Sequence, residues 1–330
     1  MMEKARRAIA GLLGVQALDV IFTSGSSESN SSAIKGVCFA NKNKKHIITT
    51  NVEHSSILNC CRQMEEVFGY RVTYLPVDST GKVSLKQVMD AVDEDTAIVS
   101  IMYVNNESGA VNPINEISEY VKKKTHAYMH VDLTQSIGKV PLDMTNIDLA
   151  SISAHKLEGL KGSGILVKKS FVPYVPLING GEQEFGIRGG TSNALVDMMF
   201  AKTLRLALEN GKKYHSCIQE MHDRLIAGLK SIEGVEINSP EDAIASTINF
   251  SYENIPSEVM QNALNEGGFM VSARSTCDSK SMNPSYVLEA MGFSEKRASS
   301  CIRVSLSYHN TLEEVDRFIE VLKGVIQLYG

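Results

Sequence analysis

The chain has 330 residues, of which 43% are hydrophobic and 22% are charged, as in ordinary globular proteins. This length is enough for a large core and for about two domains. The net charge of −5, without any long basic run, argues against direct binding of nucleic acid. The longest apolar runs, such as residues 97–104, fall short of the roughly 18 residues that a membrane helix needs, so no membrane span is expected.

Residues 4–15 place basic side chains before an apolar run and so imitate a signal peptide. Four apolar residues of this stretch nevertheless recur with the spacing of one helix face. They are Ala5, Ile9, Leu12 and Leu13. The spacing predicts an amphipathic helix rather than a leader.

From residue 19 to about 170, short β-branched runs alternate with helical patterns. The predicted strands are 20–22, 45–49, 71–75, 96–104, 127–131, 148–151 and 164–167. Such alternation is typical of βαβ units in a mostly parallel sheet covered by helices. A cofactor would bind at the carboxyl ends of these strands.

The pattern changes after the glycine-rich segment 180–190. A long helical pattern covers residues 192–232 and is predicted to be the hinge between domains. Shorter strands and helices follow it: strands at 235–237, 245–250, 270–272 and 302–306, and helices at 257–266, 285–291 and 311–328. We therefore expect a large α/β domain over 1–205 and a smaller α+β domain over 206–330.

The six cysteines include no Cys-x-x-Cys pair and no His/Cys ligand spacing, so neither a zinc site nor a disulfide framework is predicted. They are Cys38, Cys60, Cys61, Cys217, Cys277 and Cys301. A reducing cytoplasm fits best. Cys60, Cys61 and Cys301 lie in apolar patterns and are predicted to be core residues.

Asp132 ends one predicted strand, and Lys156 follows the next. An aspartate that holds a pyridinium nitrogen and a lysine that forms a Schiff base are what pyridoxal phosphate (PLP) chemistry requires. A Ser-x-His-Lys tetrapeptide alone is more often a solvated loop, so the neighbouring motifs decide between the two interpretations.

Residues 21–30 run from a strand through small residues into a helix. The free N–H groups and the positive dipole end of such a helix suit a phosphate, with the hydroxyls of Ser26 and Ser27 as further donors. An ordinary N-cap in a βα turn is the alternative.

His54 opens a helix directly after a strand, where its ring could lie over a planar cofactor and carry a proton. A capping histidine is the alternative. Residues 105–109 likewise follow a strand and would ordinarily form a turn.

Cys277 lies in the polar segment 272–284, with Arg274 and Lys280 nearby to favour a thiolate, and is a candidate nucleophile. Arg303 stands on an otherwise apolar strand, where its charge needs a partner. Either a substrate carboxylate or an internal acid could fill that role.

Together these motifs resemble the NifS/IscS-type cysteine desulfurases of the class V, PLP-dependent aminotransferase-fold enzymes. The resemblance covers nearly the whole chain, in the family's order. It implies phosphate ligands at Ser26, Ser27, Ser153, His155 and, across a dimer interface, Thr191. It implies cofactor contacts from His54, Asn106, Asp132, Gln135 and Lys156, and a substrate site at Asn106 and Arg303.

The fold implied is that of aspartate aminotransferase. The activity implied converts L-cysteine to L-alanine, with Lys156 and His54 moving protons and Cys277 receiving the sulfur as a persulfide. A sulfur-acceptor protein, such as an iron–sulfur scaffold or a tRNA-thiolation protein, would then collect it, and the enzyme would be a homodimer.

Three departures from the family pattern are Glu182 for a glycine, Phe185 for an arginine and Arg274 for a glycine. The family also carries a segment ahead of the position of Met1, so the chain is expected to be N-terminally shortened, with turnover more affected than cofactor binding. A selenocysteine lyase or related PLP lyase, or an inactive PLP-binding scaffold, are the alternatives.

Overall fold

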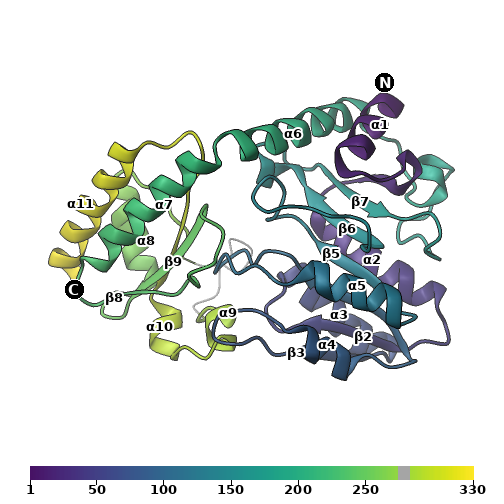
Figure 1. Cartoon of the computed structure of the whole chain (residues 1–330), viewed down its shortest axis with the longest axis horizontal. Coiled ribbons are helices and arrows are strands. Elements are labelled where there is room, and N and C mark those ends of the chain that lie inside the picture. The colour runs from purple at the N-terminus through teal and green to yellow at the C-terminus, as the bar shows by residue number, and fades with distance from the viewer. Residues whose placement is uncertain (274–282) are drawn as a thin grey trace. The chain divides into compact units, whose positions relative to one another are not determined.

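The computed structural model describes residues 1–273 and 283–330 (Figure 1). The chain divides into two compact units. The first comprises Met1–Leu75, Val83–Val104 and Asn112–Glu209, and the second comprises Pro76–Lys82, Asn105–Val111 and Asn210–Gly330. The domain limit expected after residue 205 stays a prediction, and the two units are described separately below.

The first unit contains a seven-stranded sheet in the order β1-β7-β6-β5-β4-β2-β3. Its strands are β1 (Val20–Thr23), β2 (His46–Thr50), β3 (Arg71–Leu75), β4 (Thr96–Met102), β5 (Tyr128–Asp132), β6 (Leu149–Ser153) and β7 (Gly164–Lys168). Strands β2 to β6 pair in parallel, and β7 is antiparallel to both β1 and β6. The predicted strands and the mostly parallel sheet are confirmed.

The helices of this unit are α1 (Met2–Leu13), α2 (Ser26–Ala40), α3 (Ser55–Phe68), α4 (Leu85–Ala91), α5 (Ile114–Lys124) and most of α6 (Ala194–Lys213). Short 3-10 helices cover Ala17–Asp19, Ala154–Leu157 and Gln183–Gly186. Figure 1 shows α5 in front of the sheet and α2 behind it. Apolar residues of α2 and α3, among them Ile34 and Ile57, pack with Ile47 and Ile98 of the sheet in one buried cluster.

The predicted N-terminal helix is confirmed as α1, with Ala5, Ile9 and Leu13 buried. Leu12, the fourth apolar residue with this spacing, is 36% exposed. The buried face instead includes Arg6, whose guanidinium pairs with Glu184. Hydrophobic periodicity cannot reveal an arginine that is buried because an acid distant in sequence meets it.

The long helical pattern over 192–232 is two helices rather than one, α6 and α7 (His215–Lys230). Tyr214 interrupts them with a non-helical backbone (φ −107°, ψ 11°), and its ring stacks on that of Tyr308.

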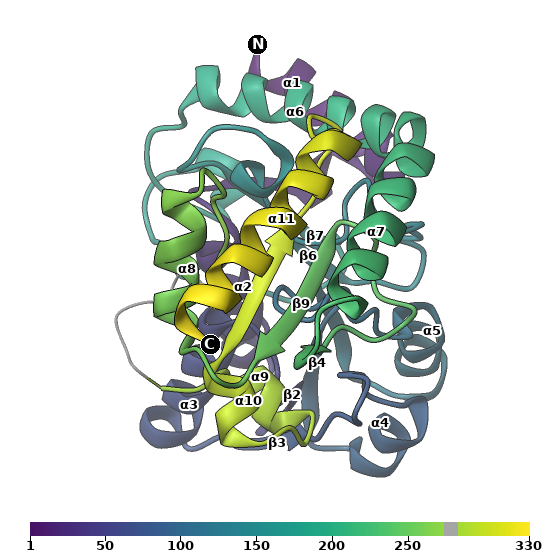
Figure 2. The same cartoon turned by 90° about the vertical axis from the view of Figure 1, so that its left-hand side faces the viewer.

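The second unit contains a three-stranded antiparallel sheet in the order β10-β9-β8. Its strands are β8 (Val235–Ile237), β9 (Thr247–Tyr252) and β10 (Cys301–Ser305), and its helices are α7, α8 (Ser257–Glu266), α9 (Tyr286–Ala290), α10 (Glu295–Ser299) and α11 (Leu312–Tyr329). Figure 2 shows α11 crossing in front of β9 and β10. Phe250, Phe318 and Leu225 belong to the shared core of these elements.

The strand predicted at 270–272 is wrong. Only a single bridge joins Ser272 to Arg303, and Met270 is 90% exposed. Cys60, Cys61 and Cys301 are buried, as predicted. Across the residues that the structure describes, no helix is long and apolar enough to cross a membrane.

Candidate active site

The turn between β1 and α2 presents the N-terminus of a 15-residue helix. Gly25 caps α2 with φ 152°, and no side chain of the described residues forms a hydrogen bond at this cap. A Cβ atom on Gly164 of β7 would lie 2.5 Å from Gly25 Cα, so the two backbones meet directly. Since the first-turn amides of a helix lack intrahelical partners, this turn offers donors to an anion. Ser26 is half-buried and Ser27 exposed at the same turn.

Ser153 and His155 lie beside this turn at the end of β6. Ser153 Oγ is 2.8 Å from His155 Nδ1, and a Cβ atom on Gly25 would lie 3.7 Å from Ser153 Oγ. Desolvation lowers the pKa of His155, and the positive charges of Lys156, Lys161 and His54 lower it further. Because Lys156 and His54 both influence His155, all three residues lie in the same neighbourhood.

Lys156 belongs to the 3-10 helix Ala154–Leu157, and its side chain is exposed. Ala154 and Leu157 on either side of it are buried and anchor the helix. The Gly159 amide donates a hydrogen bond to the Ala154 carbonyl (2.9 Å), which closes the turn behind the lysine. The lysine thus stands exposed between two buried residues of a short helix.

Asp132 ends β5 and is only 5% exposed. Its Oδ2 accepts a hydrogen bond from Asn30 Nδ2 (2.8 Å), and its Oδ1 accepts one from the Thr134 amide (2.9 Å). These two hydrogen bonds fix the orientation of the buried carboxylate. Asp132 is therefore suited to hold a protonated ring nitrogen.

His54 is the N-cap of α3, as the alternative interpretation of the sequence expected. Its Nδ1 accepts from the Ser56 amide (3.1 Å) and is 2.9 Å from Ser56 Oγ. Asn30 Nδ2 also donates to Ser56 Oγ (2.9 Å). The amide of Asn30 thus links Asp132 to the serine that orients His54, and sequence reasoning missed it. The only signal was an asparagine one turn into the helix after the phosphate turn.

Two further predicted residues of this unit lie on its loops. Gln135 is half-buried, and its Oε1 accepts a hydrogen bond from Lys139 Nζ (3.1 Å), which leaves its amide nitrogen as the donor for a ligand. Thr191 is exposed at the end of the glycine-rich loop.

That loop is tied to the phosphate turn by an ion pair that the sequence did not predict. Arg188 Nε lies 2.9 Å from Glu28 Oε1, and Glu28 Oε2 accepts from the Ser24 amide (2.8 Å). Burial opposes ionisation of Glu28, but the hydrogen bonds from Arg188 and Ser24 lower its pKa.

Asn106 and Arg303 belong to the second unit. Arg303 Nη1 donates to the Asn106 carbonyl (2.8 Å). Desolvation lowers the pKa of Arg303, whereas the charge of Glu107 opposes this effect. Among residues 1–273 and 283–330, the buried Asn106 Oδ1 atom has no hydrogen-bond partner, and an unsatisfied buried acceptor of this kind suits a ligand donor. The neighbouring turn is the expected one, with Asn105 Oδ1 accepting from the amides of Glu107 and Ser108.

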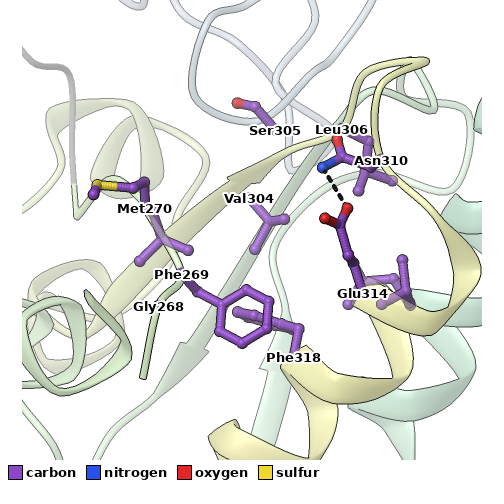
Figure 3. Close-up of a pocket in the computed structure, with 12 residues that line it drawn as sticks. Gly268, Phe269, Met270, Val304, Ser305, Leu306, Asn310, Glu314 and Phe318 are labelled. Carbon is purple, nitrogen blue, oxygen red and sulfur yellow. Dashed lines mark hydrogen bonds between the residues drawn. The ribbon is translucent and has the colours of Figure 1, made fainter. Parts of the chain in front are cut away.

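Cys277 and Arg274 lie outside the described residues. The second unit contains a cavity of about 250 Å³, lined by Phe269, Val304 and Phe318 among others. Figure 3 shows these side chains. Asn310 donates to Glu314 at its edge (3.1 Å). Of the predicted site residues that lie in the described part of the chain, none lines this cavity.

The residues of the first unit fit PLP. A helix N-terminus with serine hydroxyls suits the phosphate, a buried carboxylate suits the ring nitrogen, and an exposed lysine amine suits the aldehyde. Fold and site together define the PLP-dependent aminotransferase class.

Comparison with known proteins gives the family. The profile of the family "Aminotransferase class-V" matches residues 1–318. The chain is 40% identical to the cysteine desulfurase IscS of Methanosarcina thermophila, over 98% of this chain and 80% of the relative. It is also 40% identical to the IscS of Clostridium botulinum strain Hall, over 98% of this chain and 83% of the relative.

Solved structures agree. A NifS-like protein superposes with a TM-score of 0.92 at 37% identity, covering 99% of this chain and 87% of that one. A NifS-like protein from Rickettsia africae gives 0.87 at 28% identity, covering 99% and 88%. The chain therefore belongs to the class V aminotransferase family and, within it, to the NifS/IscS-type cysteine desulfurases.

Proposed function

We propose that this chain is a PLP-dependent enzyme that converts L-cysteine to L-alanine and passes the sulfur to Cys277. The observation that carries the proposal is the arrangement of the α2 N-terminus, Asp132 and Lys156 in one compact unit. The names of the IscS relatives support the substrate.

When bound, PLP supplies an electron-accepting ring. Asp132 would hold the ring nitrogen, since its carboxylate is buried and oriented by Asn30 and Thr134. The Lys156 amine would anchor the cofactor and would then be free to remove the Cα proton of the substrate. Arg303 binds the substrate carboxylate through its guanidinium fork.

The sulfur step is assigned to Cys277. Its thiolate attacks the sulfur of L-cysteine, so that an S–S bond forms while the C–S bond breaks and the electron pair stays with the carbon that becomes the alanine methyl group. His54 is the proposed proton carrier during this step. The persulfide then passes to a sulfur-acceptor protein, such as an iron–sulfur scaffold or a tRNA-thiolation protein.

A homodimer is part of the proposal. Helix α6 exposes apolar side chains with helical spacing, namely Leu195 (71%), Met198 (39%) and Met199 (40%). They follow the exposed Thr191, which would then reach the phosphate held by the partner copy.

The five cysteines of the described part of the chain are free thiols, which supports a reducing cytoplasm.

The test is to measure alanine and sulfide released from L-cysteine in the presence of PLP and a reductant. Cys277→Ala should abolish release while keeping the cofactor absorbance. Cys217→Ala is the matched control, because Cys217 is another free thiol, exposed on α7, and its loss should change nothing. Full activity in Cys277→Ala would contradict the assignment of Cys277. In a second experiment, competition between L-cysteine and L-selenocysteine distinguishes a cysteine desulfurase from a selenocysteine lyase.

A further inference from the structure

Glu53 is a buried carboxyl group for which the proposed reaction has no role. It lies between β2 and α3, directly before His54, and is 0% exposed. Its Oε1 accepts hydrogen bonds from the Met102 amide (2.9 Å) and from Thr50 Oγ1 (2.8 Å). An acid in such a position either carries a charge at high cost or is kept neutral.

The acid is one strand away from the ring-binding carboxylate. Met102, whose amide Glu53 binds, is the last residue of β4 and stands in register with Asp132 on β5. Neighbouring strands lie about 4.8 Å apart, so the hydrogen bond from the Met102 amide to Glu53 is made one strand away from Asp132.

The surroundings favour the neutral acid. Burial raises the pKa of Glu53 to about 8, the two hydrogen bonds lower it, and the negative charge of Asp132 raises it. Within residues 1–273, Cys61 on α3 also senses Glu53, but burial raises the pKa of that thiol well above its usual range, so it adds no charge near neutral pH.

Burial also favours the neutral form of His130, which precedes Asp132 by two residues on β5. His130 of β5 is 0% exposed, with Nδ1 2.8 Å from Ser100 Oγ and Nε2 2.9 Å from Ser151 Oγ. Burial lowers the pKa of His130 to about 4, although Asp132 opposes the shift. Burial therefore disfavours the charged forms of both Glu53 and His130.

We propose that Glu53 is a positioning residue for Asp132: its buried carboxyl group accepts the Met102 amide and so fixes the end of β4 beside the Asp132 end of β5. This inference rests on the proposed function, since the charge of Asp132 matters through the ring nitrogen it would hold. Ionisation of Glu53 would place a second negative charge beside the first and alter the electronic state of the bound ring.

The matched variant is Glu53→Gln, which keeps the acceptor oxygen and is neutral at every pH. We expect the absorbance spectrum of the PLP-loaded variant to coincide with that of the wild type at pH 7 and to depart from it above pH 8. A difference already at pH 7, or coincidence up to pH 10, would overturn the proposal.

A second readout needs no cofactor. The folded-state pKa of Glu53 is raised, so the stability that its protonated form contributes is fully present below the unfolded pKa and is lost as pH rises to about 8. The melting temperature of the apo wild type should therefore fall relative to that of Glu53→Gln between pH 5 and pH 8. The exposed Glu66→Gln on α3 is the control and should keep a constant difference from the wild type.

A constant difference for Glu53→Gln as well would also overturn the proposal. This measurement uses the apo protein, so it tests the proposal for Glu53 even if PLP does not bind. A failure of that proposal can therefore be distinguished from a failure of the proposed function.

Discussion

Asn30 on α2 donates hydrogen bonds to Asp132 Oδ2 (2.8 Å) and to Ser56 Oγ (2.9 Å). Ser56 in turn contacts His54 Nδ1. One side-chain amide thus connects the carboxylate proposed for the ring nitrogen with the histidine proposed to stack on the ring. Both proposed contacts therefore depend on Asn30, which the sequence motifs did not assign to the cofactor site.

Replacing Asn30 with Ala should weaken cofactor binding. The change removes one of the two described hydrogen bonds to a buried carboxylate, and losing a bond to a charged group costs about 1.5–3 kcal/mol. We expect the PLP dissociation constant, measured by absorbance titration, to rise by about ten-fold or more. Asn59→Ala, on the exposed face of α3, is the control, and an unchanged dissociation constant in Asn30→Ala would refute the role of the amide.

Gly164→Ala should disturb the phosphate turn. The added methyl group would meet the Gly25 backbone at 2.5 Å, and backbone cannot move aside as a side chain can. Overpacking of this kind costs about 1–3 kcal/mol. Urea unfolding and PLP titration should both register the loss. Gly11→Ala in α1, where nothing lies within 4 Å, should leave both unchanged or add slight stability, and equal behaviour of the two variants would contradict the close approach.

The Arg6–Glu184 ion pair should stabilise the first unit against unfolding. Two guanidinium nitrogens bind the two Glu184 oxygens at 2.8 and 2.9 Å, and Glu184 Oε2 also accepts from the Phe22 amide (2.8 Å). Both side chains are 3% exposed. Removing one partner of a buried pair costs about 3–5 kcal/mol, because the other charge stays buried.

We therefore expect Arg6→Met to lower the free energy of unfolding strongly, and Arg6→Met combined with Glu184→Gln to recover part of the loss. The exposed pair of Arg205 and Glu209 on α6 is the control, since breaking it should cost under about 1 kcal/mol. Additive effects in the double variant would argue against a coupled pair.

Arg303→Gln should affect substrate and spare the cofactor. The guanidinium is proposed to bind the substrate carboxylate, and a charged hydrogen bond is worth about 1.5–3 kcal/mol. We expect kcat/KM for L-cysteine to fall by about 10- to 100-fold, mainly through KM, with the PLP absorbance unchanged. Arg224→Gln at an exposed ion pair is the control. An unchanged KM would instead support the alternative that Arg303 pairs with an internal acid, such as Glu107.

Local sequence predicted the elements whose formation depends on local patterns. The strands of the large sheet follow from buried β-branched runs such as residues 96–102, which lie entirely in the core. The phosphate turn follows from small residues between a strand and a helix. The strand expected at 270–272 was wrong, because an apolar run becomes a strand only where a neighbouring edge pairs with it along its length.

By itself the sequence determined the sheet, the order of the motifs and the residue types at the ends of the strands, since each depends on neighbours along the chain. The hydrogen-bond partners of Asn30, Glu53 and Glu184, in contrast, are set by the folding of the chain. Their partners lie 102, 49 and 162 residues away. A polar side chain is buried at low cost only where folding brings it a matching donor or charge, and no local pattern records that meeting.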